Sequence, residues 1–168
     1  MNGIETERKF LIEKPGNELL SRLGGDDIVQ TYLEPEDGGT ARIRARTRDG
    51  VTTYTHTVKR RISPISSYED ERVIGEEEYL TLETRREEGT EPVKKTRYLL
   101  PYRGFIFEID VYPLWEKTAV MEVELPEEET EFSLPPEIRI IKEVSGDRRF
   151  SNHSLSRCFP EEESVYGE

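Results

Sequence analysis

Charged and apolar residues alternate along much of the chain with the period of two that is typical of β-strands. In residues 4–10, the side chains of Glu5, Glu7 and Lys9 fall on one face of an extended strand, and those of Ile4 and Phe10 fall on the other. Pairs of charged residues at i and i+2, with mainly apolar neighbours, recur in six predicted strands. These strands cover residues 4–10, 40–48, 72–83, 93–100, 105–112 and 117–125.

Turn signals separate these strands and define the remaining elements. Asp49-Gly50 predicts a hairpin between residues 40–48 and a return strand at 52–61. Residues 28–33 form a further strand, whereas Pro64 and three serines predict a loop at 62–69. Short helices are expected at 15–23 and near 151–158, with an extended piece at 138–144. The predicted fold class is α+β but mainly β, with about eight antiparallel strands, the count for a small closed barrel, and a few short flanking helices.

The alternation further predicts that this closed eight-stranded antiparallel barrel has a charged lumen and an apolar outer face. A barrel filled by apolar side chains would not carry pairs of acids and bases on one face of most strands. Outer-membrane barrels share the pattern, but Arg8, Arg60 and Arg72 interrupt any lipid-facing band. The sequence has no apolar run long enough to span a membrane and no signal-peptide pattern. We therefore expect no membrane partner.

The composition limits the partners and the compartment. The chain has 168 residues, 33% hydrophobic and 36% charged, and we expect one domain at 1–160 followed by an acidic tail at 161–168. The net charge of −12 argues against a nucleic-acid partner, although a locally basic cavity can still hold a small polyanion. The single cysteine, Cys158, cannot form an internal disulfide, which fits a reducing cytoplasm.

Any metal site in this sequence is expected to use carboxylates. Cys158, His56 and His153 are the only cysteine and histidines, which disfavours a thiolate or imidazole zinc site. Ligands that offer oxygen alone favour Mg²⁺ or Mn²⁺.

The order of the charged motifs resembles the CYTH family, also called triphosphate tunnel metalloenzymes. The opening signature of the family, Glu-x-Glu-x-Lys near the N-terminus, is matched by Glu5, Glu7 and Lys9. The match continues in order through residues 30–33, 42–44, 57–59, 95–98, 107–111, 122–124 and 143–152. The resemblance covers nearly the whole chain, and the ordered set is far more specific than any one motif.

The resemblance implies that a small-molecule triphosphate and divalent ions bind inside the lumen. The resemblance assigns phosphate binding to the cations Arg42, Arg44, Lys59, Lys95, Arg97 and Arg149. It assigns metal binding to the carboxylates Glu5, Glu7, Glu76, Glu78, Glu108, Asp110, Glu122 and Glu124. It assigns catalysis to Glu5, Glu7, Lys9 and Tyr32. Tyr32 is expected to form a hydrogen bond with Lys9 and so to position it. The strand carboxylates outnumber the strand cations, so the charges also favour a metal-dependent site.

Several positions stay open at this stage. The fifth strand carries either the pair Glu76 and Glu78 or Glu78 alone. Arg149 either reaches the tunnel mouth or anchors the tail, and Arg46 and Arg61 lie either at the rim or on the surface. Many family members carry a helix before the Lys-x-Arg strand, but residues 83–92 are too few for one. One outer face is then either less covered or covered by a partner subunit in a homodimer.

The expected function is metal-dependent hydrolysis of a linear triphosphate. Inorganic tripolyphosphate is favoured because the sequence lacks an obvious base-recognition element. The alternatives are a class IV adenylate cyclase or a thiamine triphosphatase that uses the same tunnel. An alternative from a different class is a non-catalytic module that binds polyphosphate or a nucleotide.

Overall fold

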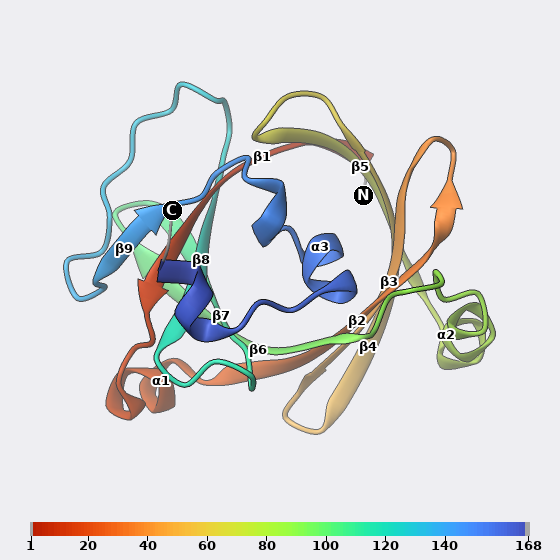
Figure 1. Cartoon of the computed structure of the whole chain (residues 1–168), viewed down its shortest axis with the longest axis horizontal. Helices are drawn as coiled ribbons and strands as arrows, with labels where there is room; N and C mark the ends of the chain where they lie inside the picture. Colours follow the sequence, from red (N-terminus) through yellow and green to blue (C-terminus); the bar gives the residue numbers. More distant parts are fainter. Residues whose placement is uncertain (1, 167–168) are drawn as a thin grey trace.

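Nine antiparallel strands form a sheet that closes on itself within residues 2–166, which are the residues that the computed structural model describes (Figure 1). The strands lie in the order β5-β4-β3-β2-β6-β7-β8-β1-β9, and β1 also pairs with β5. Their bounds are β1 Asn2–Glu13, β2 Gly25–Glu36, β3 Gly39–Arg48, β4 Val51–Arg61, β5 Ser66–Ile74, β6 Val93–Tyr102, β7 Phe105–Val111, β8 Thr118–Leu125 and β9 Ile140–Glu143. The helices are α1 Asn17–Leu23, α2 Glu76–Glu83 and α3 Asn152–Arg157, with 3₁₀ turns η1 Arg148–Phe150 and η2 Glu162–Tyr166.

The ring closes through β1, which has different partners along its length. Residues 6–13 of β1 pair with β8, whereas residues 2–6 pair with β5. Thr6 lies at the junction, and its hydroxyl is 2.8 Å from the hydroxyl of Ser66. Strand β9 pairs with β1 farther along, at residues 10–12. Strands β1–β8 therefore form the closed eight-stranded antiparallel ring that the alternation predicts, and β9 lies in the segment expected to be extended.

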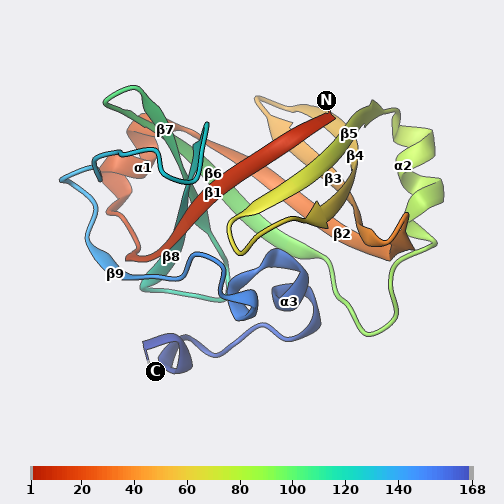
Figure 2. The same cartoon turned by 90° about the horizontal axis from the view of Figure 1, so that it is seen from above.

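The core of the protein lies largely outside the ring, as expected for strands with apolar outer faces. One cluster covers the outer faces of β1, β7 and β8, and its fully buried members include Ile12, Phe107, Ile109, Met121 and Val123. Helix α1 and the connection between β8 and β9 close over this cluster, through Leu19, Leu23 and Phe132. Figures 1 and 2 show α1 and this connection outside the ring.

Helix α2 covers a second part of the outer surface. Its buried residue, Tyr79, packs in a cluster with Leu33, Ile43 and Ile74. Both views place α2 outside the ring, on the side away from α1 (Figures 1 and 2). No helix within residues 2–166 has the length and apolar character needed to cross a membrane.

The segment around β5 and α2 differs from the sequence prediction. The pattern predicts a loop at 62–69 and a strand at 72–83, but the strand is Ser66–Ile74 and the helix is Glu76–Glu83. Gly75 separates the two, and Glu76, Glu77 and Glu78 occupy the first helical turn, where negative charge interacts favourably with the helix dipole. The strand assignment of Glu76 and Glu78 is therefore wrong. The prediction that residues 83–92 are too few for a helix before β6 is also wrong in its consequence, because helix α2 begins at Glu76, before that segment.

The C-terminal segment closes one end of the ring. The turn η1 and helix α3 lie across this end, inside the outline of the ring in Figure 1 and below it in Figure 2. Inward-facing residues of the strands pack there against the C-terminal segment; the cluster includes Leu11, Val93, Val120, Phe150 and Leu155. At the end that this segment covers, the inside of the ring is therefore apolar.

Residues 162–166 of the segment expected to be an acidic tail form η2. The carboxylate of Glu162 accepts hydrogen bonds from the backbone N–H groups of Glu116 and Lys117, and Val165 is buried. Residues 167–168 lie outside the described residues. The division into a domain at 1–160 and a tail at 161–168 stays a prediction.

The outward placement of the core can be tested on β7. Ile109 is fully buried in the outer cluster, whereas Ile106, on the same strand, is 55% exposed. Replacing Ile109 by alanine should lower the free energy of unfolding by about 2–5 kcal/mol, because it leaves a cavity in a packed cluster. The matched change Ile106→Ala should cost less than about 0.5 kcal/mol. Urea denaturation measures both; equal losses would contradict this placement of the core.

Candidate functional site

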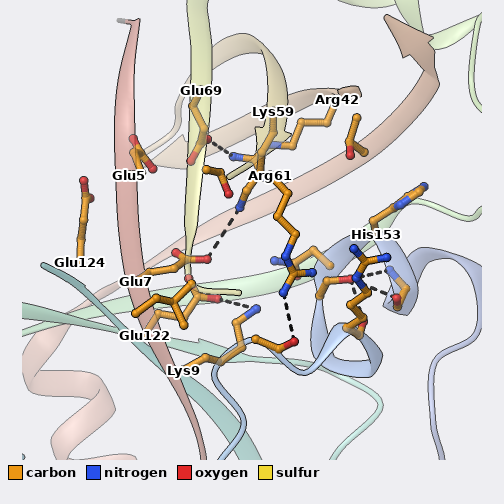
Figure 3. A pocket seen from close by; sticks show the side chains of 18 of the residues that line it. Glu5, Glu7, Lys9, Arg42, Lys59, Arg61, Glu69, Glu122, Glu124 and His153 are labelled. Atoms are coloured by element: carbon orange, nitrogen blue, oxygen red, sulfur yellow. Dashed lines mark hydrogen bonds and ion pairs between the residues drawn. The ribbon is translucent and has the colours of Figure 1, made fainter. Parts of the chain in front are cut away.

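The ring encloses a cavity of about 560 Å³ with a mostly charged lining (Figure 3). In the described part of the chain, the lining cations are Lys9, Arg42, Arg44, Arg46, Lys59, Arg61, Arg97 and Arg148. The lining carboxylates are Glu5, Glu7, Glu69, Glu71, Glu108, Glu122, Glu124 and Asp147. Alternate residues of a strand point to the same face, which places the charged i, i+2 pairs inside. The charged lumen predicted from the sequence is confirmed.

The two signs of charge come from different arcs of the ring. Most carboxylates project from β5, β1, β8 and β7, which are consecutive neighbours, and most cations project from β4, β3 and β6 on the other arc. The strand register places like charges side by side: Glu7 is the cross-strand partner of Glu124, and Glu108 is that of Glu122. Lys9 is the cation within the acidic arc, and it pairs across the strands with Glu122.

Crowding of carboxylates raises two pKa values into the neutral range. A hydrogen bond with the Glu69 carboxylate, together with burial, raises the pKa of Glu5 to about 8. The charge of Glu122, together with burial, raises the pKa of Glu7 to about 7. Each of these pairs therefore retains a proton near neutral pH. A cation bound at either pair would replace that proton.

Lys9 is held from two sides. Its ammonium group lies 3.4 Å from Glu122 and donates a hydrogen bond to the backbone carbonyl of Phe150 at 3.1 Å. The Tyr32 hydroxyl lines the same cavity but accepts a hydrogen bond from Gln30 Nε2 at 3.1 Å. Within residues 2–166, the structure does not contain the hydrogen bond expected between Tyr32 and Lys9. Glu122 and the C-terminal segment position Lys9 instead.

Ion pairs join the two arcs where they meet. Arg42 on β3 lies 3.4 Å from Glu69 on β5, and Lys59 on β4 lies 3.8 Å from Glu7 on β1 (Figure 3). Arg61, near the end of β4, donates hydrogen bonds to the backbone carbonyls of the following loop and of Gly146. The cavity lining includes Arg46 as well as Arg61, so both belong to the cavity rather than to the outer surface.

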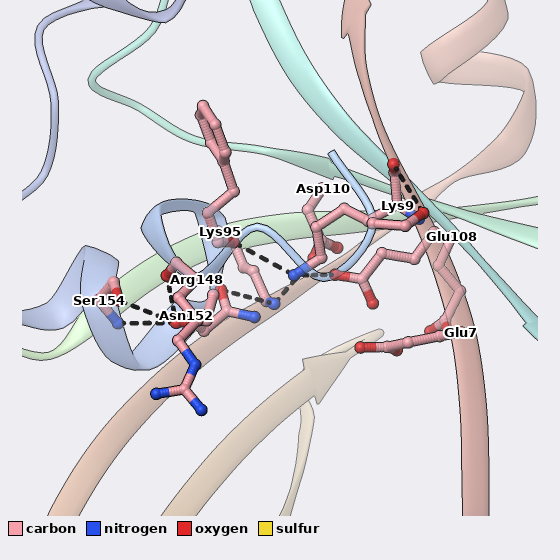
Figure 4. A network of polar contacts seen from close by, with 12 residues as sticks. Glu7, Lys9, Lys95, Glu108, Asp110, Arg148, Asn152 and Ser154 are labelled. Atoms are coloured by element: carbon pink, nitrogen blue, oxygen red, sulfur yellow. Dashed lines mark hydrogen bonds and ion pairs between the residues drawn. The ribbon is translucent and has the colours of Figure 1, made fainter. Parts of the chain in front are cut away.

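A largely buried network of charged and polar side chains borders the cavity (Figure 4). The ammonium group of Lys95 is 2.8 Å from Asp110, and neither side chain is exposed. Arg97 donates two hydrogen bonds to Asp110 at 2.8 and 2.9 Å and also pairs with Glu108 at 2.6 Å. Asn152 on α3 accepts hydrogen bonds from the Tyr112 hydroxyl and from Lys95. Burial lowers the pKa of Lys95 to about 8 despite its carboxylate partner.

The structure gives Lys95, Asp110 and Arg149 other surroundings than the sequence predicts. Lys95 and Asp110 are not part of the cavity lining among the described residues, whereas Arg97 is. Lys95 and Asp110 therefore support Arg97 from beneath rather than face the cavity. Arg149, expected to bind phosphate, has a 65% exposed side chain that pairs with Asp147; its neighbour Arg148 lines the cavity.

The acidic residues that line the cavity from β5 are Glu69 and Glu71, and the sequence analysis assigns no role to either. Glu76 and Glu78 lie on α2 outside the ring, where Glu78 pairs with Arg72 at 2.5 Å. The signal was present, because Glu69 and Glu71 are an i, i+2 pair like those of the other strands. The nearby proline and serines instead indicated a loop.

The sequence analysis also assigns no site role to residues of α3, although Asn152 ends the last matched motif. Asn152, His153 and Ser154 contribute to the cavity lining at the closed end. The His153 ring lies against Tyr32, with ring centroids 4.8 Å apart, and its Nε2 contacts Glu87 at 2.7 Å. No spacing rule links a C-terminal helix to strand residues so distant in sequence, so only the folded chain reveals these contacts.

The donor set of the cavity fits a hard divalent cation. The acidic arc offers carboxylate oxygens, the ligand type that Mg²⁺ and Mn²⁺ prefer. Two of its pairs, Glu5 with Glu69 and Glu7 with Glu122, retain protons that a cation could replace. Among residues 2–166, no three or more His, Cys, Asp or Glu side chains are already arranged as a metal-binding group. The carboxylates are therefore grouped as pairs rather than as a preformed cage.

Comparison with solved structures connects this geometry to known proteins. The crystal structure of the hypothetical protein NE1496 superposes with a TM-score of 0.58 and 31% sequence identity, over 93% of this chain and 99% of that chain. A second structure, described as the inorganic triphosphatase NE1496, gives a TM-score of 0.56 and 29% identity with the same coverage. The PH1819 protein from Pyrococcus horikoshii OT3 shares the fold, with a TM-score of 0.53 and 19% identity over 74% of this chain and 80% of that chain.

No protein-family model and no curated protein matches the chain. The closed ring with paired charges inside and an apolar exterior is the architecture of a triphosphate tunnel fold. The chain belongs to the CYTH family.

The raised pKa values of Glu5 and Glu7 predict how stability depends on pH. These carboxyls bind protons more tightly in the folded protein, at about pH 8 and 7, than in the unfolded chain. The folded state therefore holds more protons than the unfolded state between roughly pH 5 and pH 8, and the free energy of unfolding should fall as pH rises through this range. Thermal denaturation in EDTA measures the trend.

Glu5→Gln should flatten this dependence, because the substituted side chain does not titrate. Glu18→Gln, on the exposed face of α1, is the matched control and should keep the wild-type slope. A metal-free protein that becomes more stable between these pH values would contradict the assignment.

Proposed function

We propose that this protein is a divalent-metal-dependent hydrolase of a linear triphosphate and that inorganic tripolyphosphate is its substrate. The observation that carries the proposal is the division of the cavity into a cationic arc and an acidic arc. A polyphosphate requires cations around its non-bridging oxygens, and the metal ions that accompany it require carboxylates. A cavity with one arc of each kind serves both requirements.

The cationic arc would bind the phosphate groups. Arg42, Arg44, Arg97 and Lys59 offer guanidinium and ammonium donors from three strands. Arginine presents a planar fork that matches phosphate oxygens, and lysine presents a compact charge. The buried contacts of Arg97 with Asp110 and Glu108 fix its orientation before any substrate enters. Lys95 would act through this network without touching phosphate.

The acidic arc would hold the metal. We assign this role to the carboxylates Glu5, Glu7, Glu69, Glu108, Glu122 and Glu124. A bound divalent ion would neutralise phosphate charge and lower the pKa of an attacking water. Asp110 is engaged by Lys95 and Arg97, and Glu76 and Glu78 lie outside the ring, so these three are not proposed as ligands.

Lys9 and Tyr32 would add further contacts from the protein to the bound substrate. Lys9 projects from the acidic arc and is oriented by Glu122 and the Phe150 carbonyl, so its charge can reach a phosphate oxygen near the metal. The Tyr32 hydroxyl supplies a neutral donor to the same cavity. The similarity to the protein described as the inorganic triphosphatase NE1496, over 93% of this chain, supports tripolyphosphate as the substrate. A cytoplasmic location and a homodimer stay predictions.

A direct assay tests the proposed function. The purified protein should release phosphate from tripolyphosphate in the presence of Mg²⁺ or Mn²⁺ and lose this activity in EDTA. Parallel reactions with ATP and thiamine triphosphate should be slower by kcat/KM. Formation of cyclic AMP from ATP would instead indicate a cyclase, and binding of tripolyphosphate without turnover would indicate a binding module. Either result would overturn the proposal.

The reassigned acidic pair of β5 gives a second test. Glu69→Gln should weaken Mn²⁺ binding and lower kcat/KM by about tenfold or more, because it removes a carboxylate charge from the metal arc. Glu78→Gln is the same chemical change on the outside of the ring and should alter either value by less than about twofold. Calorimetric titration with Mn²⁺ and the phosphate-release assay measure both. Equal effects of the two substitutions would contradict the assignment of the metal arc to β5.

A further inference from the structure

Gln30 is a fully buried amide at the centre of the cationic arc. It projects from β2 toward the lumen between two cavity-lining residues. Its Oε1 accepts two hydrogen bonds from Arg44, from Nε at 3.1 Å and from Nη2 at 3.0 Å. Its Nε2 donates a third to the Tyr32 hydroxyl at 3.1 Å. One neutral side chain therefore holds two groups that line the cavity.

The partner of Arg44 differs in kind from the partners of Arg42, Arg46 and Arg97, which also line the cavity. Arg42 pairs with Glu69, Arg46 with Asp26 and Arg97 with Asp110, so each of these faces a carboxylate. Arg44 donates two hydrogen bonds to a neutral amide oxygen. Burial, together with the charges of Arg42 and Arg97, lowers the pKa of Arg44 to about 10, which leaves the guanidinium charged at neutral pH.

A neutral partner has a consequence for anion binding. A carboxylate would orient Arg44 equally well but would cancel its charge and compete with an incoming phosphate. An amide oxygen orients the guanidinium through its Nε and Nη2 groups and adds no opposing charge. The guanidinium of Arg44 is then fixed in position, and its positive charge is not neutralised before an anion binds.

The same hydrogen bonds set the direction of the Tyr32 hydroxyl. Arginine has only donors, so the amide oxygen of Gln30 must face Arg44 and its NH₂ group must face Tyr32. The hydroxyl oxygen of Tyr32 therefore acts as an acceptor toward Gln30. Its own proton is left to point elsewhere, and Tyr32 lines the cavity.

We propose that Gln30 is a positioning residue for substrate binding, which orients Arg44 toward a phosphate group without neutralising it and directs the Tyr32 hydroxyl proton into the cavity. The inference rests on the proposed function for the identity of the ligand, a linear triphosphate. It adds a residue to which neither the sequence pattern nor the charges of the cavity assign a role.

The substitution Gln30→Glu separates this role from a purely structural one. The introduced carboxylate can accept the same two hydrogen bonds from Arg44, so the melting temperature should stay at the wild-type value or rise. Binding should nevertheless weaken, with the Kd for tripolyphosphate and the KM both raised by about tenfold or more, because the charge of Arg44 is cancelled. If Gln30 only supported the fold, Gln30→Glu would bind tripolyphosphate as well as the wild type, and that result would overturn the proposal.

A double-mutant cycle provides an independent test, including the case in which Gln30→Glu does not fold. Gln30→Met keeps the size of the side chain but loses its hydrogen bonds, and Arg44→Met removes the guanidinium. If Gln30 acts through Arg44, the two losses of affinity should be strongly non-additive in the double variant. Fully additive losses would overturn the proposal. Thr31→Val, a buried change on the outer face of the same strand, is the control and should leave the Kd unchanged.

Calorimetric titration with tripolyphosphate separates failure of this inference from failure of the proposed function. A wild-type protein that binds tripolyphosphate without hydrolysing it, together with weakened binding by Gln30→Glu, would overturn the hydrolase and support the role of Gln30. Hydrolysis with unchanged binding by Gln30→Glu would do the reverse. A wild-type protein that does not bind tripolyphosphate would overturn both.

Gln30 is the only glutamine in the sequence, which also allows direct observation. In protein labelled with ¹⁵N at the glutamine side chain, its amide should give a single pair of resonances. The pair should shift on addition of tripolyphosphate and exchange faster with solvent in Arg44→Met. Resonances that respond to neither change would contradict the contact between Gln30 and Arg44.

Discussion

Burial of many charges inside a ring of strands is the constraint on which this structure depends. An unpaired buried charge is too costly to retain, so each charged side chain in the enclosed part needs a partner of opposite charge or a hydrogen-bonding group. Lys95, Asp110 and Arg97 meet this requirement at the base of the cavity through direct contacts of 2.8 to 2.9 Å. Most apolar residues of the strands must then face outward, and the helices and long connections are needed to cover them.

This requirement is met fully at the base of the cavity and only in part in the acidic arc, where we propose that the metal binds. Around the base, opposite charges alternate and neutralise each other. Toward the acidic arc, like charges meet, and the structure tolerates them only by retaining protons on Glu5 and Glu7, whose pKa values rise to about 8 and 7. Enzymes concentrate such perturbed groups where a ligand of opposite charge is to bind. The same repulsion that is expected to weaken the metal-free protein at higher pH would favour binding of the proposed cations.

The period-two pattern predicted the ring and the charged lumen because alternation reports directly which face of a strand a residue occupies. It failed at β5 and α2, where Pro64 and the serines suggested a loop and the run from Glu76 to Glu78 matched a strand of acids. A charge run fits a helix N-terminus equally well, so local sequence cannot separate the two. The pattern also cannot show how far along the axis of the ring a lumen-facing residue lies. Lys95 and Arg97 share a face, yet one is sealed beneath the cavity and the other lines it.

The alternation of charged and apolar residues also does not show which side chain a lumen arginine will contact. Arg42 and Arg44 are adjacent positions of one face, and the sequence treats them as equivalent phosphate ligands. In the folded chain, one faces the carboxylate of Glu69 and the other faces the amide of Gln30. An arginine whose charge is already shared must give up part of an ion pair to bind an anion, whereas one held by an amide gives up only dipolar contacts. The two arginines therefore differ in what it costs to engage a phosphate, and this difference comes from the opposing strands rather than from β3 itself.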